Sequence, residues 1–95
     1  MNINNLIEST QRKDPPNQLS EIHLALWYAL KGDWDMAHNI TQEIQSETAS
    51  WIHAYLHRKE GDIGNANYWY RRANKKPYSG SLKAELDEIV RTEFT

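Results

Sequence analysis

The strongest constraint on the fold of this chain is an internal repeat near its middle. Residues 24–37 (LALWYALKGDWDMA) align with residues 53–66 (HAYLHRKEGDIGNA) at a constant offset of 29 positions. Four identical pairs carry the alignment: Ala25 and Ala54, Gly32 and Gly61, Asp33 and Asp62, and Ala37 and Ala66. Glycine readily adopts the left-handed backbone that ends a helix, and aspartate caps the first turn of the next one. Each copy therefore predicts a helical hairpin, made of a helix, a Gly-Asp bend and a second helix.

Apolar side chains recur at helical spacing over most of the chain. The pattern is weak over residues 3–12 and strong over residues 19–31, 34–45, 47–59, 63–75 and 81–94. No segment alternates with a period of two for long enough to be a strand. We therefore expect an all-α protein, a compact bundle of five to six helices with two helical hairpins at its centre.

Two prolines divide the chain, because proline cannot occupy a helix interior and forces the preceding residue into extended geometry. Residues 1–17, which include Pro15 and Pro16, are expected to form an N-terminal helix and a linker with some independence. Residues 18–95 are expected to form the helical domain, with hairpins over 18–45 and 47–76 and a capping helix over 81–94. Within it, residues 51–57 are apolar on nearly all sides, which predicts a central, buried helix.

The composition argues against several classes of protein. With 95 residues the chain suits one small domain, and without cysteine it has no disulfides and no thiolate metal ligands. The net charge of -2, with acidic and basic residues mixed, argues against a general nucleic-acid binder. No apolar run has the length of a signal peptide or a membrane span. We therefore expect a cytoplasmic protein that binds neither nucleic acid nor membrane.

The two copies resemble the tetratricopeptide repeat, a family of helical hairpins with a small residue in the first helix, Gly-Asp at the bend and alanine in the second helix. The matching positions are Ala25, Tyr28, Gly32, Asp33 and Ala37 in the first copy and Ala54, Gly61, Asp62, Ala66, Tyr70 and Ala73 in the second, with Pro77 near the family's closing proline. The copies are shorter than the roughly 34 residues of that family, and His57 replaces its aromatic residue. Because two hairpins are few for a solenoid, we expect a closed bundle. The chain is also similar to small uncharacterised bacterial proteins, a likeness that implies no activity.

His53 and His57 are candidate ligand-binding residues. They lie four positions apart and can share one helix face with Glu60, while His38 lies on the helix expected to pack nearby. Imidazoles and a carboxylate can together hold a divalent metal ion. The motif H-E-x-x-H is absent, however, because Ala54 occupies the position of its glutamate.

The repeat favours a structural interpretation of the same histidines. His53 aligns with Leu24, and His57 aligns with Tyr28. These positions face the partner helix of the hairpin, where a half-buried histidine with hydrogen-bonded nitrogens is tolerated at modest cost. The metal site is therefore the alternative hypothesis.

Residues 65–76 (NANYWYRRANKK) form the most positive stretch of the chain. Aromatic residues interleaved with arginine can stack on bases and hold phosphates, so Arg71 and Arg72 are candidate contacts for an acidic peptide or an anionic ligand. Packing explains the aromatic pattern better, and basic residues in a last helical turn complement the helix dipole. We also expect Glu60 or Asp62 to form an ion pair with Arg58 or Arg71.

No catalytic or cofactor-binding motif is recognisable. Gly61 and Gly64 do not form a phosphate-binding loop, and no serine is set beside a histidine and an acid in a strained turn. A catalytic role thus has no positive support, and no cofactor is expected. The architecture indicates a small protein-interaction or oligomerisation module that binds a protein or peptide partner, a homodimer included. The alternative is a metal- or small-ligand-binding protein that uses the histidine cluster.

Overall fold

The computed structural model describes residues 2–94, and within this range all regular secondary structure is helical. The helices are α1 (Ile3–Ser9), α2 (Glu21–Lys31), α3 (Trp34–Gln42), α4 (Glu47–Lys59), α5 (Ile63–Arg72) and α6 (Leu82–Glu93). The prediction of an all-α bundle of five to six helices is confirmed. None of the described helices combines the length and the apolar character needed to cross a membrane.

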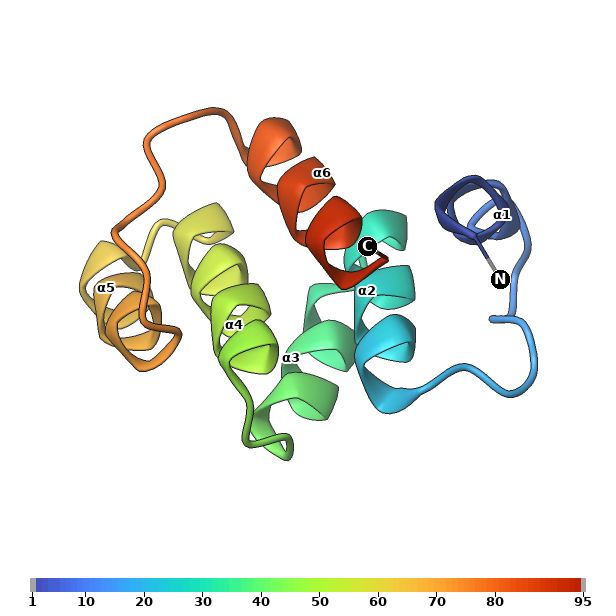
Figure 1. The fold of residues 1–95 in the computed structure, drawn as a ribbon, viewed down its shortest axis with the longest axis horizontal. Helices are drawn as coiled ribbons and strands as arrows, with labels where there is room; N and C mark the ends of the chain where they lie inside the picture. The colour runs from blue at the N-terminus through green and yellow to red at the C-terminus, as the bar shows by residue number, and fades with distance from the viewer. Residues whose placement is uncertain (1, 95) are drawn as a thin grey trace.

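The two hairpins are the pairs α2–α3 and α4–α5, and α3 packs against α4 to join them (Figure 1). α4 is the central helix, since it contacts α2, α3, α5 and α6. Each of its residues from 49 to 57 is buried, as expected for a segment that is apolar on nearly all sides. α6 packs on α4 and α2 and so covers one side of the hairpins.

The Gly-Asp bends of the two hairpins have the same geometry. Gly32 and Gly61 both have φ 88°, a left-handed conformation that side chains with a Cβ resist. Asp33 accepts a hydrogen bond from the backbone N–H of Met36, as Asp62 does from that of Asn65, so each aspartate caps the following helix. The alanines that the repeat places on each side of the bends are buried, and this lets the helices of each pair approach closely.

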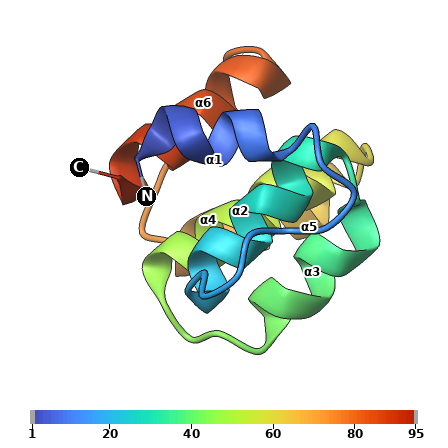
Figure 2. The same cartoon turned by 90° about the vertical axis from the view of Figure 1, so that its right-hand side faces the viewer.

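α1 packs on α2 despite the two prolines that follow it. The side chain of Leu6 is fully buried, and Trp27 Nε1 donates a hydrogen bond of 3.0 Å to Ser9 Oγ. Lys31 Nζ donates to the carbonyl oxygens of Thr10 and Arg12. Figure 2 shows α1 lying along the same side of the bundle as α6. The N-terminal helix is therefore part of the packed structure.

α4 has the predicted bounds, and the ends of the other helices differ from the predicted ones by at most three residues. α2 begins after Ser20, whose hydroxyl accepts from the His23 N–H at 3.1 Å and caps the helix. α5 ends at Arg72 and not near residue 75, because Asn74 adopts φ 60° and the Lys75 N–H turns back to the Tyr70 carbonyl. Asparagine here takes the helix-ending role that glycine takes elsewhere.

A buried carboxylate ties α6 to the second hairpin. Glu85 has no exposed surface, and its carboxylate accepts hydrogen bonds from Trp51 Nε1 at 3.1 Å and from the Tyr70 hydroxyl at 2.5 Å. Arg58 forms an ion pair with it at 3.0 Å. Among the described residues neither Glu60 nor Asp62 forms an ion pair with Arg58 or Arg71, so that expectation was wrong. A carboxylate without solvent is costly, and these three partners offset that cost.

Candidate functional site

The structure brings His38, His53 and His57 together at the junction of the two hairpins. His38 comes from α3, and the other two lie one turn apart on α4. Trp34 Nε1 donates a hydrogen bond of 2.7 Å to the Leu56 carbonyl, which fixes α3 against α4. The imidazole centroids lie 4.4 Å apart for His38 and His53, 5.2 Å for His38 and His57, and 4.8 Å for His53 and His57. We call these three side chains the histidine cluster.

The nitrogen atoms of the cluster converge. One ring nitrogen from each histidine can be chosen so that the three atoms all lie within 4.8 Å of one another. His57 Nδ1 lies 2.7 Å from Glu60 Oε1, and because a carboxylate oxygen accepts, Nδ1 donates this hydrogen bond and its direction is fixed by Glu60. His53 Nδ1 is buried and, among the described residues, has no hydrogen-bond partner. The hydrogen bonds expected of a purely structural histidine are thus incomplete at His53.

Two tryptophans close the cluster from either side. Trp34 stacks on His38 with ring centroids 4.7 Å apart, and Trp69 of α5 stacks on His53 at 3.8 Å. The Arg72 guanidinium lies over the outer face of Trp69, 4.9 Å from a ring centroid. Our sequence reasoning did not assign the tryptophans to the site. The spacing of four between Trp34 and His38 is the signal that could have linked that pair.

Burial favours the neutral form of two imidazoles in the cluster, those of His53 and His38. The pKa of His53 is lowered to about 3, chiefly by burial and to a lesser extent by His38, His57 and Arg72. Burial also lowers the pKa of His38, with the His57 imidazole as the second cause. Removal of an imidazolium from water is costly, and two imidazolium ions in contact repel each other. Neutral imidazole is the form that binds metal ions.

The predicted basic residues separate in the structure. Arg72 joins the edge of the cluster through Trp69 and donates a hydrogen bond of 3.3 Å to the Tyr68 hydroxyl. Arg71 lines a different hollow of about 410 Å³, together with Asn74, Lys75 and Lys76. Arg71 and Arg72 thus border different features, and their role as contacts for an acidic peptide or an anionic ligand stays a prediction.

A second feature, which sequence reasoning missed, is an apolar groove between α1 and α6. It has a volume of about 420 Å³. Its apolar side chains come from α1, α2, α4 and α6: Ile7, Leu30, Tyr55, Leu82 and Leu86. Lys59, Lys83 and Asp87 also line it, and all three are exposed. No pattern within one helix predicts this groove, because its walls come from four helices.

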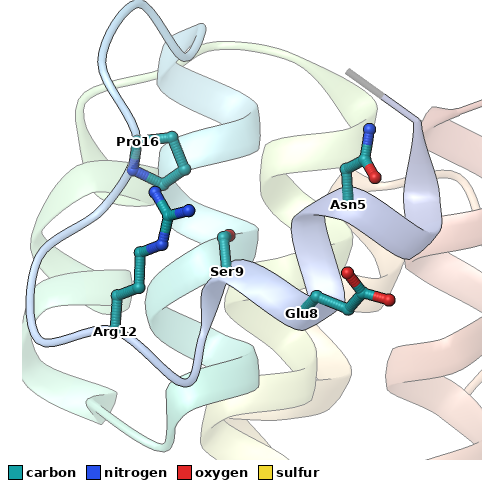
Figure 3. A pocket seen from close by; sticks show the side chains of 5 residues that line it. All are labelled: Asn5, Glu8, Ser9, Arg12 and Pro16. Carbon is teal, nitrogen blue, oxygen red and sulfur yellow. The ribbon is translucent and has the colours of Figure 1, made fainter.

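A third hollow, of about 380 Å³, lies between α1 and the loop that follows it (Figure 3). In Figure 3 the Arg12 side chain extends toward Pro16, and the Glu8 carboxylate points away from it. The Ser9 hydroxyl donates to the Leu6 carbonyl at 2.7 Å and accepts from Trp27 Nε1. The polar groups that line this hollow do not converge, and Ser9 already takes part in the packing of α1.

No family model, no curated protein and no solved structure matches this chain. The function is therefore inferred from the geometry of the histidine cluster and of the groove.

Proposed function

We propose that this chain is a small tetratricopeptide-like interaction module, which binds an apolar, acidic peptide segment of a protein partner in the groove between α1 and α6. The repeat-like character is supported by the equal bends at Gly32 and Gly61 and by the matching caps at Asp33 and Asp62. Short hairpin arrays of this kind present grooves that accept helices or extended peptides.

The observation that carries the proposal is the apolar lining of the groove. Ile7 is 42% exposed, which is high for a large apolar residue, and Leu30 and Leu82 are only half-buried beside it. Full burial of one such side chain by a partner contributes about 1.5–3 kcal/mol. Three anchors therefore supply part of the binding free energy, and polar contacts must add the rest to exceed the cost of association.

The charges around the groove define the kind of peptide. The ammonium groups of Lys59 and Lys83 outnumber the single carboxylate of Asp87 among the lining residues of the groove. Acidic residues beside the apolar anchors would meet this positive charge, which favours orientation and rapid association. A basic peptide would be repelled. The partner segment is therefore expected to carry apolar anchors flanked by Asp or Glu.

The experiment is a selection from a random peptide library displayed on phage, with the purified full chain as bait. The test variant is Ile7→Lys, which places a charge in the groove on an exposed position. The matched control is Ile63→Lys, because Ile63 is an exposed apolar residue, 54% accessible, at the start of α5 and outside the groove. We expect acidic peptides with apolar anchors to be enriched on the wild type and on Ile63→Lys, and to be lost on Ile7→Lys.

Sedimentation equilibrium of the same proteins tests whether the occupant is a second copy of the chain. A dimer that Ile7→Lys dissociates and Ile63→Lys retains would show that the groove is a homodimer interface. Equal enrichment of peptides on all three proteins, or no enrichment on a monomeric wild type, would contradict the proposal.

A further inference from the structure

We infer that the histidine cluster is a binding site for one divalent first-row transition metal ion, held by imidazole nitrogens of His38, His53 and His57. This site lies at the junction of the hairpins and is separate from the groove between α1 and α6. It does not depend on peptide binding there.

The imidazole nitrogens of the three histidines lie close enough together to share one ion. Three atoms that lie within 4.8 Å of one another have a common point no more than about 3 Å from each, whereas a Zn²⁺–nitrogen bond measures about 2.0–2.1 Å. Small rotations of the rings, with nitrogen shifts of about 1 Å, would bring all three onto one ion. The backbone of α3 and α4 already places the side chains for this.

The donor set of the cluster selects the kind of metal ion. Each of the three histidines brings an imidazole nitrogen to the cluster. Three imidazole ligands suit Zn²⁺, Co²⁺, Ni²⁺ and Cu²⁺ and do not suit Mg²⁺ or Ca²⁺, which prefer oxygen ligands. His38 is half-buried, so the cluster is open on the α3 side. A fourth ligand, such as water, can reach the ion from there.

The partner of His57 is a further argument. A metal-bound histidine usually donates its other ring nitrogen to a carboxylate or carbonyl, which fixes the tautomer and the direction of the ring. Glu60 Oε1 accepts such a bond from His57 Nδ1 at 2.7 Å, and the other nitrogen of His57 is left for the ion. Glu60 is accordingly a positioning residue and not a ligand.

The unsatisfied nitrogen of His53 is the last argument. The residue is only 3% exposed, and its Nδ1 has no hydrogen-bond partner in the described part of the chain. Buried polar atoms in folded proteins are nearly always paired, and an exception needs an explanation. A ring that is kept as imidazole, stacked on Trp69 and directed among two other histidines, is accounted for by a metal ion.

A second group of ligand-type residues nearby does not form another site. His57, Glu60 and Asp62 also have atoms close together. The contact of His57 with Glu60 is explained by their hydrogen bond, and Asp62 caps α5 through the Asn65 N–H. We therefore infer one metal ion, held by the histidine cluster.

The test uses the full chain without an affinity tag, freed of metal with EDTA and then dialysed. Titration calorimetry with ZnCl₂ at pH 7.5 should show one ion per chain. Addition of CoCl₂ should give the intense visible absorption of four-coordinate Co²⁺, which reports the ligand geometry independently of affinity.

The decisive variant is His38→Ala, because His38 is half-buried and its loss is the least disruptive to the core. The matched control is His23→Ala, also half-buried but on α2, where it stacks on Phe94. We expect His38→Ala to weaken Zn²⁺ binding by at least about tenfold and to abolish the Co²⁺ spectrum, with no change for His23→Ala. Glu60→Gln, which keeps the shape but not the charge, should weaken binding by about 10-fold to 100-fold.

Circular dichroism of each variant shows whether the fold is retained. Zn²⁺ should raise the melting temperature of the wild type and of His23→Ala but not that of a folded His38→Ala. Absence of Zn²⁺ binding by the folded wild type would overturn the inference, and so would equal affinities of His38→Ala and His23→Ala.

Discussion

The hydroxyl of Tyr70 on α5 donates a hydrogen bond of 2.5 Å to the carboxylate of Glu85 on α6, a side chain with no exposed surface. Arg58 and Trp51 of α4 bind the same carboxylate. Burial raises the pKa of Tyr70, and so does this hydrogen bond. Three helices thus meet at one carboxylate, and the position of α6, which forms one wall of the groove, depends on it.

Removal of the Tyr70 hydroxyl should destabilise the protein. A hydrogen bond to a buried charged group contributes about 1.5–3 kcal/mol, so we expect Tyr70→Phe to lower the free energy of unfolding by about 2 kcal/mol. The control is Tyr68→Phe, because Tyr68 is 46% exposed and its hydroxyl accepts a hydrogen bond from Arg72, which is itself exposed. That change should stay within about 0.5 kcal/mol. Urea unfolding followed by tryptophan fluorescence measures both, and equal losses would show that the Glu85 contact is not stabilising.

Sequence reasoning predicted the hairpins because their signals are local. The Gly-Asp bends, the aspartate caps and the helical spacing of apolar residues each lie within a few positions, and all three appear in the structure. The Glu85 network was not predicted, because Trp51 and Glu85 lie 34 positions apart and a glutamate on an amphipathic helix is usually exposed. The docking of α1 was missed for the same reason, since Ser9 and Trp27 are joined only by the fold.

The candidate site was only partly predictable. The spacing of His53 and His57 on one helix could be read from the sequence, and the repeat placed His38 nearby. The stacking of Trp69 on His53 requires the packing of α5 against α4, and the unpartnered nitrogen of His53 requires the full set of neighbours. A repeat predicts the approach of helices but not the direction of each side chain.

Substitution by alanine should change the free energy of unfolding in opposite directions at Gly61 and Gly64, the two glycines around the second bend. Gly61 has φ 88°, where a Cβ costs about 1–2 kcal/mol, so Gly61→Ala should lower the free energy of unfolding by that amount. Gly64 lies inside α5, and a Cβ there meets no atom within 4 Å. Gly64→Ala should therefore raise the free energy of unfolding by about 0.5–1 kcal/mol. Thermal and urea unfolding measure both, and a gain at Gly61 would show that the bend does not constrain the hairpin.

The N-terminal helix should contribute to global stability. Leu6 is fully buried while its neighbour Ile7 is 42% exposed, which gives a matched pair on one helix. Truncation of a buried leucine to alanine costs about 2–5 kcal/mol, so we expect a loss of about 2–3 kcal/mol for Leu6→Ala in a short helix at the edge of the fold. Ile7→Ala should cost less than about 1 kcal/mol. If both changes leave the urea midpoint unaltered, α1 unfolds before the bundle and is independent of it.

The stability of the metal-free protein should fall as the pH drops below neutrality. Burial lowers the pKa of His53 to about 3 in the folded protein, against 6.5 for an exposed histidine. The titratable and charged groups that face it are His38 of α3, His57 of α4 and Arg72 of α5. Well above pH 6.5, His53 is neutral in both the folded and the unfolded protein, so its titration takes nothing from the free energy of unfolding. As the pH falls through that value, the unfolded chain binds a proton that the folded protein does not.

We expect the free energy of unfolding to fall by about 1 kcal/mol per pH unit between pH 6 and pH 5. This window lies above the main titration of the carboxylates. Urea unfolding in EDTA at several pH values measures this slope for the wild type. His53→Gln cannot be protonated, so its slope should be smaller by nearly that amount, whereas His23→Gln should keep the wild-type slope. Parallel curves for His53→Gln and the wild type would mean that His53 gains its proton within the folded protein. Such a result would contradict the lowered pKa of His53 and the burial of its ring against Trp69 as the cause.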